Sequence, residues 1–259
     1  MAEPILSTRK LNKSFGPVHV LHDVDFDVYP GEVTALVGDN GAGKSTLVKC
    51  IAGINGIDSG EVRFEGELVQ LTDPRVATGL GIEFVYQDLA LADNLDITQN
   101  MFLGREITQS RMFLSDGEME RQARETLKSL SVRTVSSVRQ TVANLSGGQR
   151  QTVAIAKAVL WNSKVVFLDE PTAALGVAQT RQVLDLGRRL ADQGRGVVLI
   201  SHNMNDVMEV ADRVAALYLG RVAAEVHTKD TTTTQIVELI TAGRSGDVGL
   251  APATVNESI

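Results

Sequence analysis

The segment GDNGAGKST, residues 38–46, most narrowly limits what this chain can fold into. It fits the pattern G-x-x-x-x-G-K-[ST], in which glycines let the backbone wrap so that its N–H groups and the start of a helix face an anion. The preceding EVTALVG is a short apolar β-rich run, and the following GKSTLVKCIAG is typical of a helix that Gly53 closes. Strand, glycine-rich loop and helix in this order predict an α/β domain that binds the phosphates of a nucleotide.

Each polar side chain of this loop has a candidate role. Lys44 can reach the β- and γ-phosphates of a nucleotide, Ser45 can hold Mg²⁺, and Thr46 can contact an inner phosphate. The alternative is a tight turn between a strand and a helix that carries an exposed lysine. The backbone positions predicted to line the phosphates are Gly38, Asn40, Gly41, Ala42 and Gly43.

The rest of the hydrophobic pattern predicts the same fold class. From Val165, VVFLDE, an amphipathic helix and GVVLISH alternate, and buried strands alternating with helices indicate a parallel sheet covered on both faces. Earlier, VLHDVDFDVYPGE alternates Val24, Phe26 and Val28 with acidic residues, which predicts a small antiparallel sheet ending in a Pro-Gly turn. VAALYLGRVAAEV predicts a closing hairpin around Gly220 and Arg221.

Between about Gln87 and Leu145 the β-branched runs give way to helical patterns. In SDGEMERQARETLKSLSV, Ser115 and Glu118 predict a capping box, and a single helical face carries Met119, Ala123, Leu127 and Leu130. We therefore expect an inserted helical subdomain at about 88–150, within one α/β domain over 1–242. The remainder, 243–259, has no periodicity and is expected to be a loose tail.

Further polar residues follow the predicted strands. Asp169 ends a buried strand, where open α/β sheets bind ligands, and is placed to hold Mg²⁺ through water. Glu170, one residue on, can polarise an attacking water. A strand-end acid can instead cap a helix. His202 ends the next strand, although a lone histidine is more often structural, and Gln87, in FVYQD, could simply terminate the sheet.

Composition excludes some classes of function. The net charge of −7 and the scattered basic residues argue against nucleic acid as a partner. No apolar run approaches the roughly 18 residues that cross a bilayer, and MAEPILSTRK lacks the apolar stretch of a signal peptide. Cys50 is the only cysteine, so no internal disulfide can form, which fits a reducing compartment. We therefore expect the chain to stay in the cytoplasm and to meet a membrane only through a partner.

Taken in order, GDNGAGKST, YQ, LSGGQ, VVFLDEPT and SH resemble the nucleotide-binding subunit of an ABC transporter over residues 5 to about 242. LSGGQ between the two other motifs is the most specific element. The resemblance implies an ATPase with Mg-ATP as cofactor. It implies that Gln87 senses Mg²⁺, water and the transmembrane partner, that His202 touches the γ-phosphate, and that Phe15 stacks on adenine rather than packing in the core.

The resemblance also explains a second glycine-rich turn, residues 144–149. Ser146 can cap the helix that follows, while Gly147 and Gly148 bare backbone N–H groups at a helix N-terminus. The alternative is an ordinary helix start after a loop. In the family, two subunits pack head to tail, and each ATP is clamped between the phosphate loop of one subunit and the LSGGQ of the other. The set Ser146, Gly147, Gly148 and Gln149 would therefore bind the ATP of a second copy or of a sibling ATPase.

Within the family, GDNGAGKSTLVKCIAG, YQDLALADNLDITQNMFLGRE and EPTAALGV are most similar to ATPases of bacterial monosaccharide importers of the ribose, xylose and fructose type. This implies transmembrane permease subunits as partners, an extracytoplasmic sugar-binding protein acting indirectly, and a place on the cytoplasmic face of the membrane. The alternatives are a soluble ABC ATPase without a permease and an ABC subunit for another substrate. Many importers of this type fuse two modules, whereas this sequence has one. Gly176 stands where most members carry Asp, so that residue's interface contact is not carried over.

Overall fold

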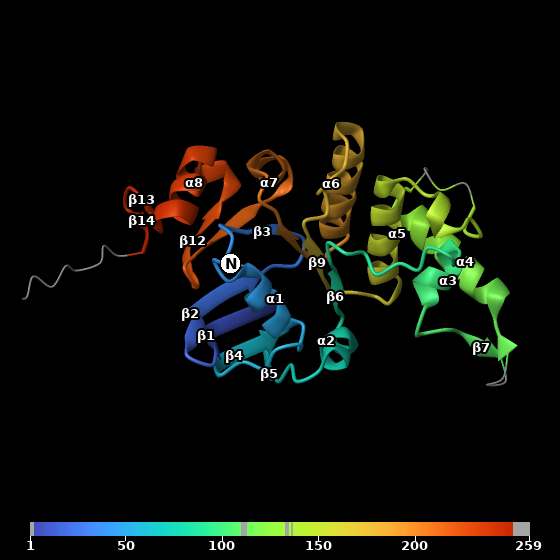
Figure 1. Cartoon of the computed structure of the whole chain (residues 1–259), viewed down its shortest axis with the longest axis horizontal. Helices are drawn as coiled ribbons and strands as arrows, with labels where there is room; N and C mark the ends of the chain where they lie inside the picture. Colours follow the sequence, from blue (N-terminus) through green and yellow to red (C-terminus); the bar gives the residue numbers. More distant parts are fainter. Residues whose placement is uncertain (1–2, 110–112, 133–134, 136, 251–259) are drawn as a thin grey trace, which may run out of the picture.

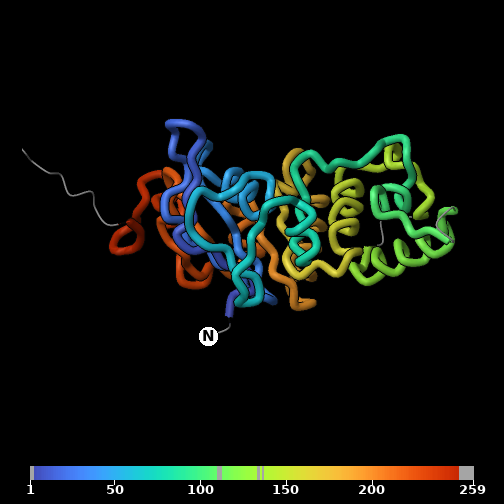
Figure 2. The backbone as a smooth tube through the Cα atoms, turned by 90° about the horizontal axis from the view of Figure 1, so that it is seen from below, coloured from blue at the N-terminus to red at the C-terminus, as the bar shows by residue number. Residues whose placement is uncertain are grey.

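The computed structural model describes residues 3–109, 113–132, 135 and 137–250. The molecule is elongated, with a helical lobe at one end and the last described helix and hairpin at the other (Figures 1 and 2). Two sheets lie between these ends. The sheets and the lobe are the three parts of the predicted fold class, which is thereby confirmed.

A mainly parallel central sheet organises the molecule. Its order is β12-β11-β3-β10-β9-β6, and every neighbouring pair is parallel except the β11–β12 hairpin. Almost every residue of β3, β9 and β10 is buried, because helices cover both faces of the sheet. The strands are β3 (Val33–Gly38), β6 (Ile82–Val85), β9 (Val165–Asp169), β10 (Gly196–Ile200), β11 (Arg213–Tyr218) and β12 (Arg221–His227).

The N-terminal strands form a separate antiparallel sheet with the order β2-β1-β4-β5. Its alternating residues Val24, Phe26 and Val28 are fully buried, as their period predicts. They pack, together with α1 (Lys44–Ile51), in one apolar cluster against the central sheet. The strands are β1 (Leu6–Phe15), β2 (Val18–Val28), β4 (Ser59–Phe64) and β5 (Glu67–Val69).

The helical lobe contains α3 (Ile97–Phe102), α4 (Asp116–Ser129) and the start of α5 (Gly147–Leu160) (Figure 1). The predicted apolar face of α4 is buried. The predicted capping box is wrong: Ser115 precedes α4, but its side chain makes no capping hydrogen bond. Its φ of −95° and ψ of 69° depart from the extended geometry of capping residues. The Glu118 carboxylate instead accepts hydrogen bonds from Arg121 and Gln122.

The remaining elements cover the central sheet or connect its strands. A short hairpin joins α3 to α4, and two 3-10 turns lie before α5 and after β12. These elements are α2 (Pro74–Leu80), α6 (Val177–Asp192), α7 (Met204–Val210), α8 (Thr233–Ala242), β7 (Thr108–Gln109), β8 (Phe113–Leu114), η1 (Val142–Asn144) and η2 (Thr228–Asp230). Among the described residues, no helix combines the length and apolar character that crossing a bilayer requires.

The predicted loose tail differs from the structure in its first part. After Gly243, β13 (Arg244–Ser245) and β14 (Val248–Gly249) form a small antiparallel hairpin, and the Leu250 N–H donates to the Gly243 carbonyl. Gly243 has a φ of +74° and ends α8, so the reversal there lets the chain fold back. Residues 251–259 of the predicted tail lie outside the described residues. The boundaries expected for the domain and its helical subdomain stay predictions.

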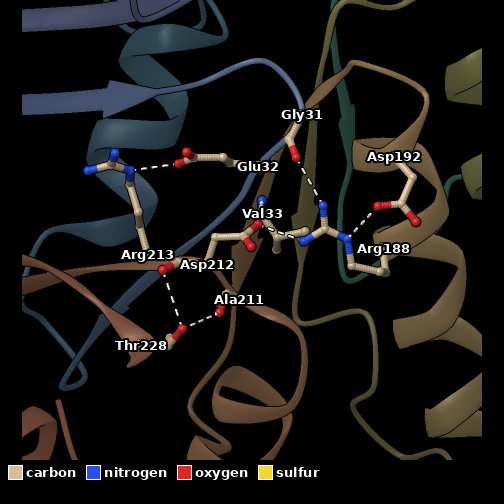
Figure 3. A network of polar contacts seen from close by, with 9 residues as sticks. All are labelled: Gly31, Glu32, Val33, Arg188, Asp192, Ala211, Asp212, Arg213 and Thr228. Carbon is tan, nitrogen blue, oxygen red and sulfur yellow. Dashed lines mark hydrogen bonds and ion pairs between the residues drawn. The ribbon is translucent and has the colours of Figure 1, made fainter. Parts of the chain in front are cut away.

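A polar network fastens α6 to the edge where the central strands begin (Figure 3). The Arg188 guanidinium donates to the Asp212 carboxylate at 2.6 Å and to the Gly31 carbonyl at 2.9 Å. Asp212 also accepts from the Val33 N–H at 2.7 Å. These bonds link Arg188 of α6 to the start of β3, at the end of the central sheet opposite the carboxyl ends of its parallel strands.

Candidate active site

The phosphate loop leaves the carboxyl end of β3 and enters α1, as predicted. Three of its glycines are required by the structure. Gly41 and Gly43 have φ values of +82° and +106°, which residues with a Cβ rarely adopt. A Cβ on Gly38 would lie 2.5 Å from the Leu217 carbonyl oxygen. The backbone can therefore wrap closely here, while Asn40 at the loop tip is exposed and Ala42 is buried.

Lys44 is the first residue of α1, and its ammonium folds back over the loop. The Nζ atom donates to the carbonyl oxygens of Gly38 at 2.7 Å and Asp39 at 3.1 Å. Burial lowers the pKa of Lys44, and the nearby carboxylates of Glu170, Asp39 and Asp169 oppose that shift. The side chains of Ser45, exposed, and Thr46, half-buried, follow in the same first turn. The loop thus combines backbone donors, a cation and hydroxyls at one helix N-terminus.

Asp169 ends β9, and Glu170 follows it at the carboxyl edge of the sheet. Burial raises the pKa of the Asp169 carboxyl, the neighbouring charge of Glu170 raises it further, and the charge of Lys44 lowers it. Glu170 has a left-handed φ of +46°, and its N–H donates to the Ile200 carbonyl at 2.9 Å. The two acids and Lys44 are thus electrostatic neighbours, which supports the expectation that they serve one ligand.

His202 lies in the loop after β10, and its Nδ1 is 3.0 Å from Glu170 Oε1. The expectation that His202 ends the strand is slightly wrong, because β10 ends at Ile200. Gln87 likewise stands two residues beyond the end of β6 and is exposed. Since β6, β9 and β10 are parallel neighbours, all three loops leave the same edge of the sheet. The structure brings His202 into contact with Glu170, and it places Gln87 at the same edge without a described contact to either.

Phe15 ends β1 and lies outside the core. Its side chain is 47% exposed, and the Lys13 ammonium stands 5.4 Å from the centre of its ring. An exposed aromatic ring with a cation over it is not ordinary core packing. The ring therefore remains available for stacking on a flat ligand.

The second glycine-rich turn starts α5 as expected. Ser146 caps the helix: its side chain accepts from the Gln149 N–H, and the Gln149 Oε1 accepts from the Ser146 N–H at 2.8 Å. In Figure 1, α1 and α5 lie on either side of β6 and β9, so the two glycine-rich turns belong to different parts of the molecule.

The glycines of this turn have a packing role that sequence patterns did not indicate. A Cβ on Gly148 would lie 3.0 Å from the Gln179 Cβ in α6, and one on Gly147 would lie 3.2 Å from Leu175 Cδ2. Gly176, between these two contacts, precedes α6, and a Cβ there would meet open space. The segment after Glu170 therefore packs directly on the start of α5.

Three residues near the site escaped the sequence analysis. Thr172, Asn203 and Asp206 are linked by hydrogen bonds between the loop after Glu170 and the loop after His202. Asp206 is 6% exposed and stands in the first turn of α7, where its charge also suits the helix dipole. The only available signal was an acidic residue four positions after His202, and the sequence alone gave no partner for it.

Fold and site together define a P-loop ATPase of the ATP-binding cassette class. The ABC transporter family matches residues 21–173, which is more than half of the chain, so the protein belongs to that family. The resemblance inferred from the motifs is thereby confirmed.

The chain is similar to proteins of sugar import systems. It is 48% identical to the fructose import ATP-binding protein of Rhizobium meliloti, over 93% of this chain and 95% of that protein. It is 44% identical to the xylose/arabinose import ATP-binding protein of Sulfolobus acidocaldarius, over 95% and 97% of the two chains. A ribose import ATP-binding protein of Rubrobacter xylanophilus is 42% identical over 86% of this chain, which spans 44% of that longer protein.

Solved structures agree with this membership. An ATP-binding cassette of an ABC transporter superposes with a TM-score of 0.81 at 25% identity, over 92% of this chain and 97% of that one. A dimeric bacterial ABC transporter cassette superposes with a TM-score of 0.71 at 25% identity, over 86% and 98% of the two chains.

Proposed function

We propose that this protein is the ATP-hydrolysing subunit of a bacterial sugar importer and drives uptake through a partner permease. The observation that carries the proposal is its match, over more than nine-tenths of both chains, to two sugar import ATP-binding proteins. Its net charge of −7 gives no support to a nucleic-acid partner.

The phosphate loop binds the nucleotide in this proposal. The N–H groups of residues 38–46 and the Lys44 ammonium hold the phosphates, Thr46 contacts an inner phosphate, and Phe15 stacks on adenine. Mg²⁺ suits the donors offered by Ser45, Gln87 and Asp169, because a hydroxyl, an amide and a carboxylate are hard oxygen ligands. When bound, Mg²⁺ neutralises charge on the phosphates.

Glu170 orients and polarises the attacking water. His202, whose Nδ1 lies 3.0 Å from Glu170 Oε1, contacts the γ-phosphate. Gln87 lies in the segment that connects β6 to α3 of the helical lobe, and it reports the nucleotide state to the permease. The contact between the Glu170 carboxylate and the His202 imidazole supports this proposal, because both side chains could then act on one nucleotide.

Two copies, or this chain and a sibling ATPase, enclose ATP head to tail. The phosphate loop is open at its tip, where Asp39, Asn40 and Gly41 are exposed. Ser146, Gly147, Gly148 and Gln149 of a second subunit supply the missing wall with a helix N-terminus. A dimeric cassette among the similar solved structures supports this arrangement. ATP then joins the subunits, and its hydrolysis releases them.

Through the permease, the pair of ATPases occupies the cytoplasmic face of the membrane, and an extracytoplasmic sugar-binding protein delivers the substrate. The test combines transport and hydrolysis. The chain is co-expressed with the permease genes nearest to its own, purified as a complex and reconstituted in vesicles. Uptake of labelled pentoses and hexoses should require ATP and should stop in Glu170→Gln, which keeps ATP binding. Glu170→Gln hydrolysing near the parent rate, or a chain that co-purifies with no membrane protein, would contradict the proposal.

A further inference from the structure

The two loops that carry Glu170 and His202 need support from outside themselves. Glu170 and Ala174 both have left-handed φ values, +46° and +61°, although neither is glycine. Such a conformation costs free energy for a residue with a Cβ and persists only where the surroundings hold it. The His202 side chain is 70% exposed, so its own packing does little to fix it. The distance of 3.0 Å between Glu170 Oε1 and His202 Nδ1 therefore depends on how the two loops are held.

The Asp206 carboxylate contacts both loops. Its Oδ2 accepts a hydrogen bond from the Thr172 hydroxyl at 2.7 Å, and its Oδ1 accepts one from the Asn203 side-chain amide at 3.0 Å. Thr172 lies two residues after Glu170, and Asn203 is the neighbour of His202. One buried carboxylate thus bridges the backbone segments of the two side chains that form the proposed catalytic pair.

The Asn203 side of this bridge is itself fixed. Its side-chain oxygen accepts from the Asn205 N–H at 3.0 Å, and its own N–H donates to the Ser201 hydroxyl at 3.0 Å. Asn203 thereby caps α7 while its amide turns toward Asp206. Within this bridge, the bond from Thr172 is the one that crosses to the other loop, and it adds a side-chain link to the backbone bond from the Glu170 N–H to the Ile200 carbonyl.

We propose that Asp206 is a positioning residue for ATP hydrolysis, which sets the distance between Glu170 and His202 through Thr172 and Asn203. This inference rests on the proposed roles of Glu170 and His202. A buried carboxylate is retained only when it is hydrogen-bonded, and bonds to a charged acceptor are short and strong. Both side-chain partners of Asp206 come from the loops of the site. The Asp206 bridge therefore stabilises the positions of Glu170 and His202, and not only the start of α7.

The test uses full-length chains with isosteric changes. Thr172→Val removes the hydroxyl, and Asp206→Asn replaces one acceptor oxygen with a donor. We expect each to lower kcat for ATP hydrolysis by about tenfold or more, because misplacing a catalytic group by about 1 Å costs up to about 10²-fold. The Kd for ATP should change by less than about twofold, since the phosphate loop is untouched. The double variant should be no slower than the worse single variant, and Thr172→Ser should restore kcat.

Thr8→Val is the matched control. Thr8 is fully buried in β1 of the antiparallel sheet, not in the central sheet that carries Glu170 and His202, and its hydroxyl donates to the Val24 carbonyl at 3.1 Å. Thr8→Val should lower the melting temperature about as much as Thr172→Val does, but it should leave kcat unchanged. Normal kcat in folded Thr172→Val and Asp206→Asn, or an equal loss of kcat in Thr8→Val, would overturn the inference. Glu170→Gln in the same assay distinguishes failure of the proposed function from failure of this inference. If Glu170→Gln still hydrolyses ATP, the proposed role of Glu170 is wrong whatever the Asp206 variants show.

Discussion

Replacing Gly148 by alanine tests the packing of α5 against α6. The added Cβ would lie 3.0 Å from the Gln179 Cβ and 3.1 Å from its Cγ. Such contacts are tighter than ordinary packing of carbon atoms, so the neighbouring atoms must give way by a few tenths of an ångström. Turning the Gln179 side chain moves Cγ but leaves Cβ in place. We therefore expect the start of α5 to move slightly away from α6, together with the backbone N–H groups that follow Ser146.

We expect Gly148→Ala to cause a modest loss of stability and a measurable loss of turnover. Overpacking costs about 1–3 kcal/mol, and replacing a helical glycine by alanine returns about 1 kcal/mol, which leaves a net loss of about 0–2 kcal/mol. Misplacing a catalytic group by about 1 Å reduces the rate by up to about 10²-fold, so a smaller shift of the turn proposed to contact ATP should cost less than this. We therefore expect kcat for ATP hydrolysis to fall about 3- to 10-fold, with ATP binding to the single subunit unchanged.

The assay measures kcat, the Kd for ATP and the melting temperature side by side. Gly79→Ala is the control, because Gly79 lies in α2 and a Cβ there would meet open space. That variant should keep the parent kcat and the same or a slightly higher melting temperature. Parent-level hydrolysis by Gly148→Ala would refute the reasoning, since it would mean that the position of the α5 N-terminus is irrelevant to the reaction.

Three further outcomes are expected. Lys44→Ala should weaken nucleotide binding itself, because the ammonium is the cation of the phosphate loop; an unchanged Kd for ATP would remove it from that role. Ser146→Arg should leave binding to one subunit intact but abolish hydrolysis, as measured by equilibrium titration and steady-state turnover, and normal turnover would count against a shared site. Cys50 is 1% exposed, and burial raises the pKa of its thiol to about 11, so a thiol reagent at pH 8 should label it only after unfolding. Rapid labelling of the native protein would show that the thiol is accessible.

Local patterns in the sequence were sufficient for much of the fold. The phosphate loop depends on glycine φ values and on the strand–loop–helix order, and both are local. The Ser146 cap also needs only the next three residues. At Ser115 the predicted capping box is absent, because the backbone there is not extended, and the Glu118 carboxylate accepts from Arg121 and Gln122 instead. A motif predicts a local bond only when no neighbour offers a better one.

The geometry of the site depends on contacts between distant segments, which a single sequence does not reveal. The pairing of Glu170 with His202 follows from β9 and β10 being neighbours. The bridge through Asp206 requires the first turn of α7 to pack against the loop after β9, which carries Thr172. The tight approach of Gln179 to Gly148 likewise depends on how α6 lies against α5.

The same packing limits how the lobe can move. One apolar cluster runs without interruption from Met101 and Met119 in the lobe, through Val153 of α5, to Leu186 of α6 and Leu168 in the central sheet. A hinge rotation of the lobe away from the central sheet would expose this shared apolar core to water. The shared core therefore favours small sliding movements of α5 along its neighbours, which keep these apolar contacts closed.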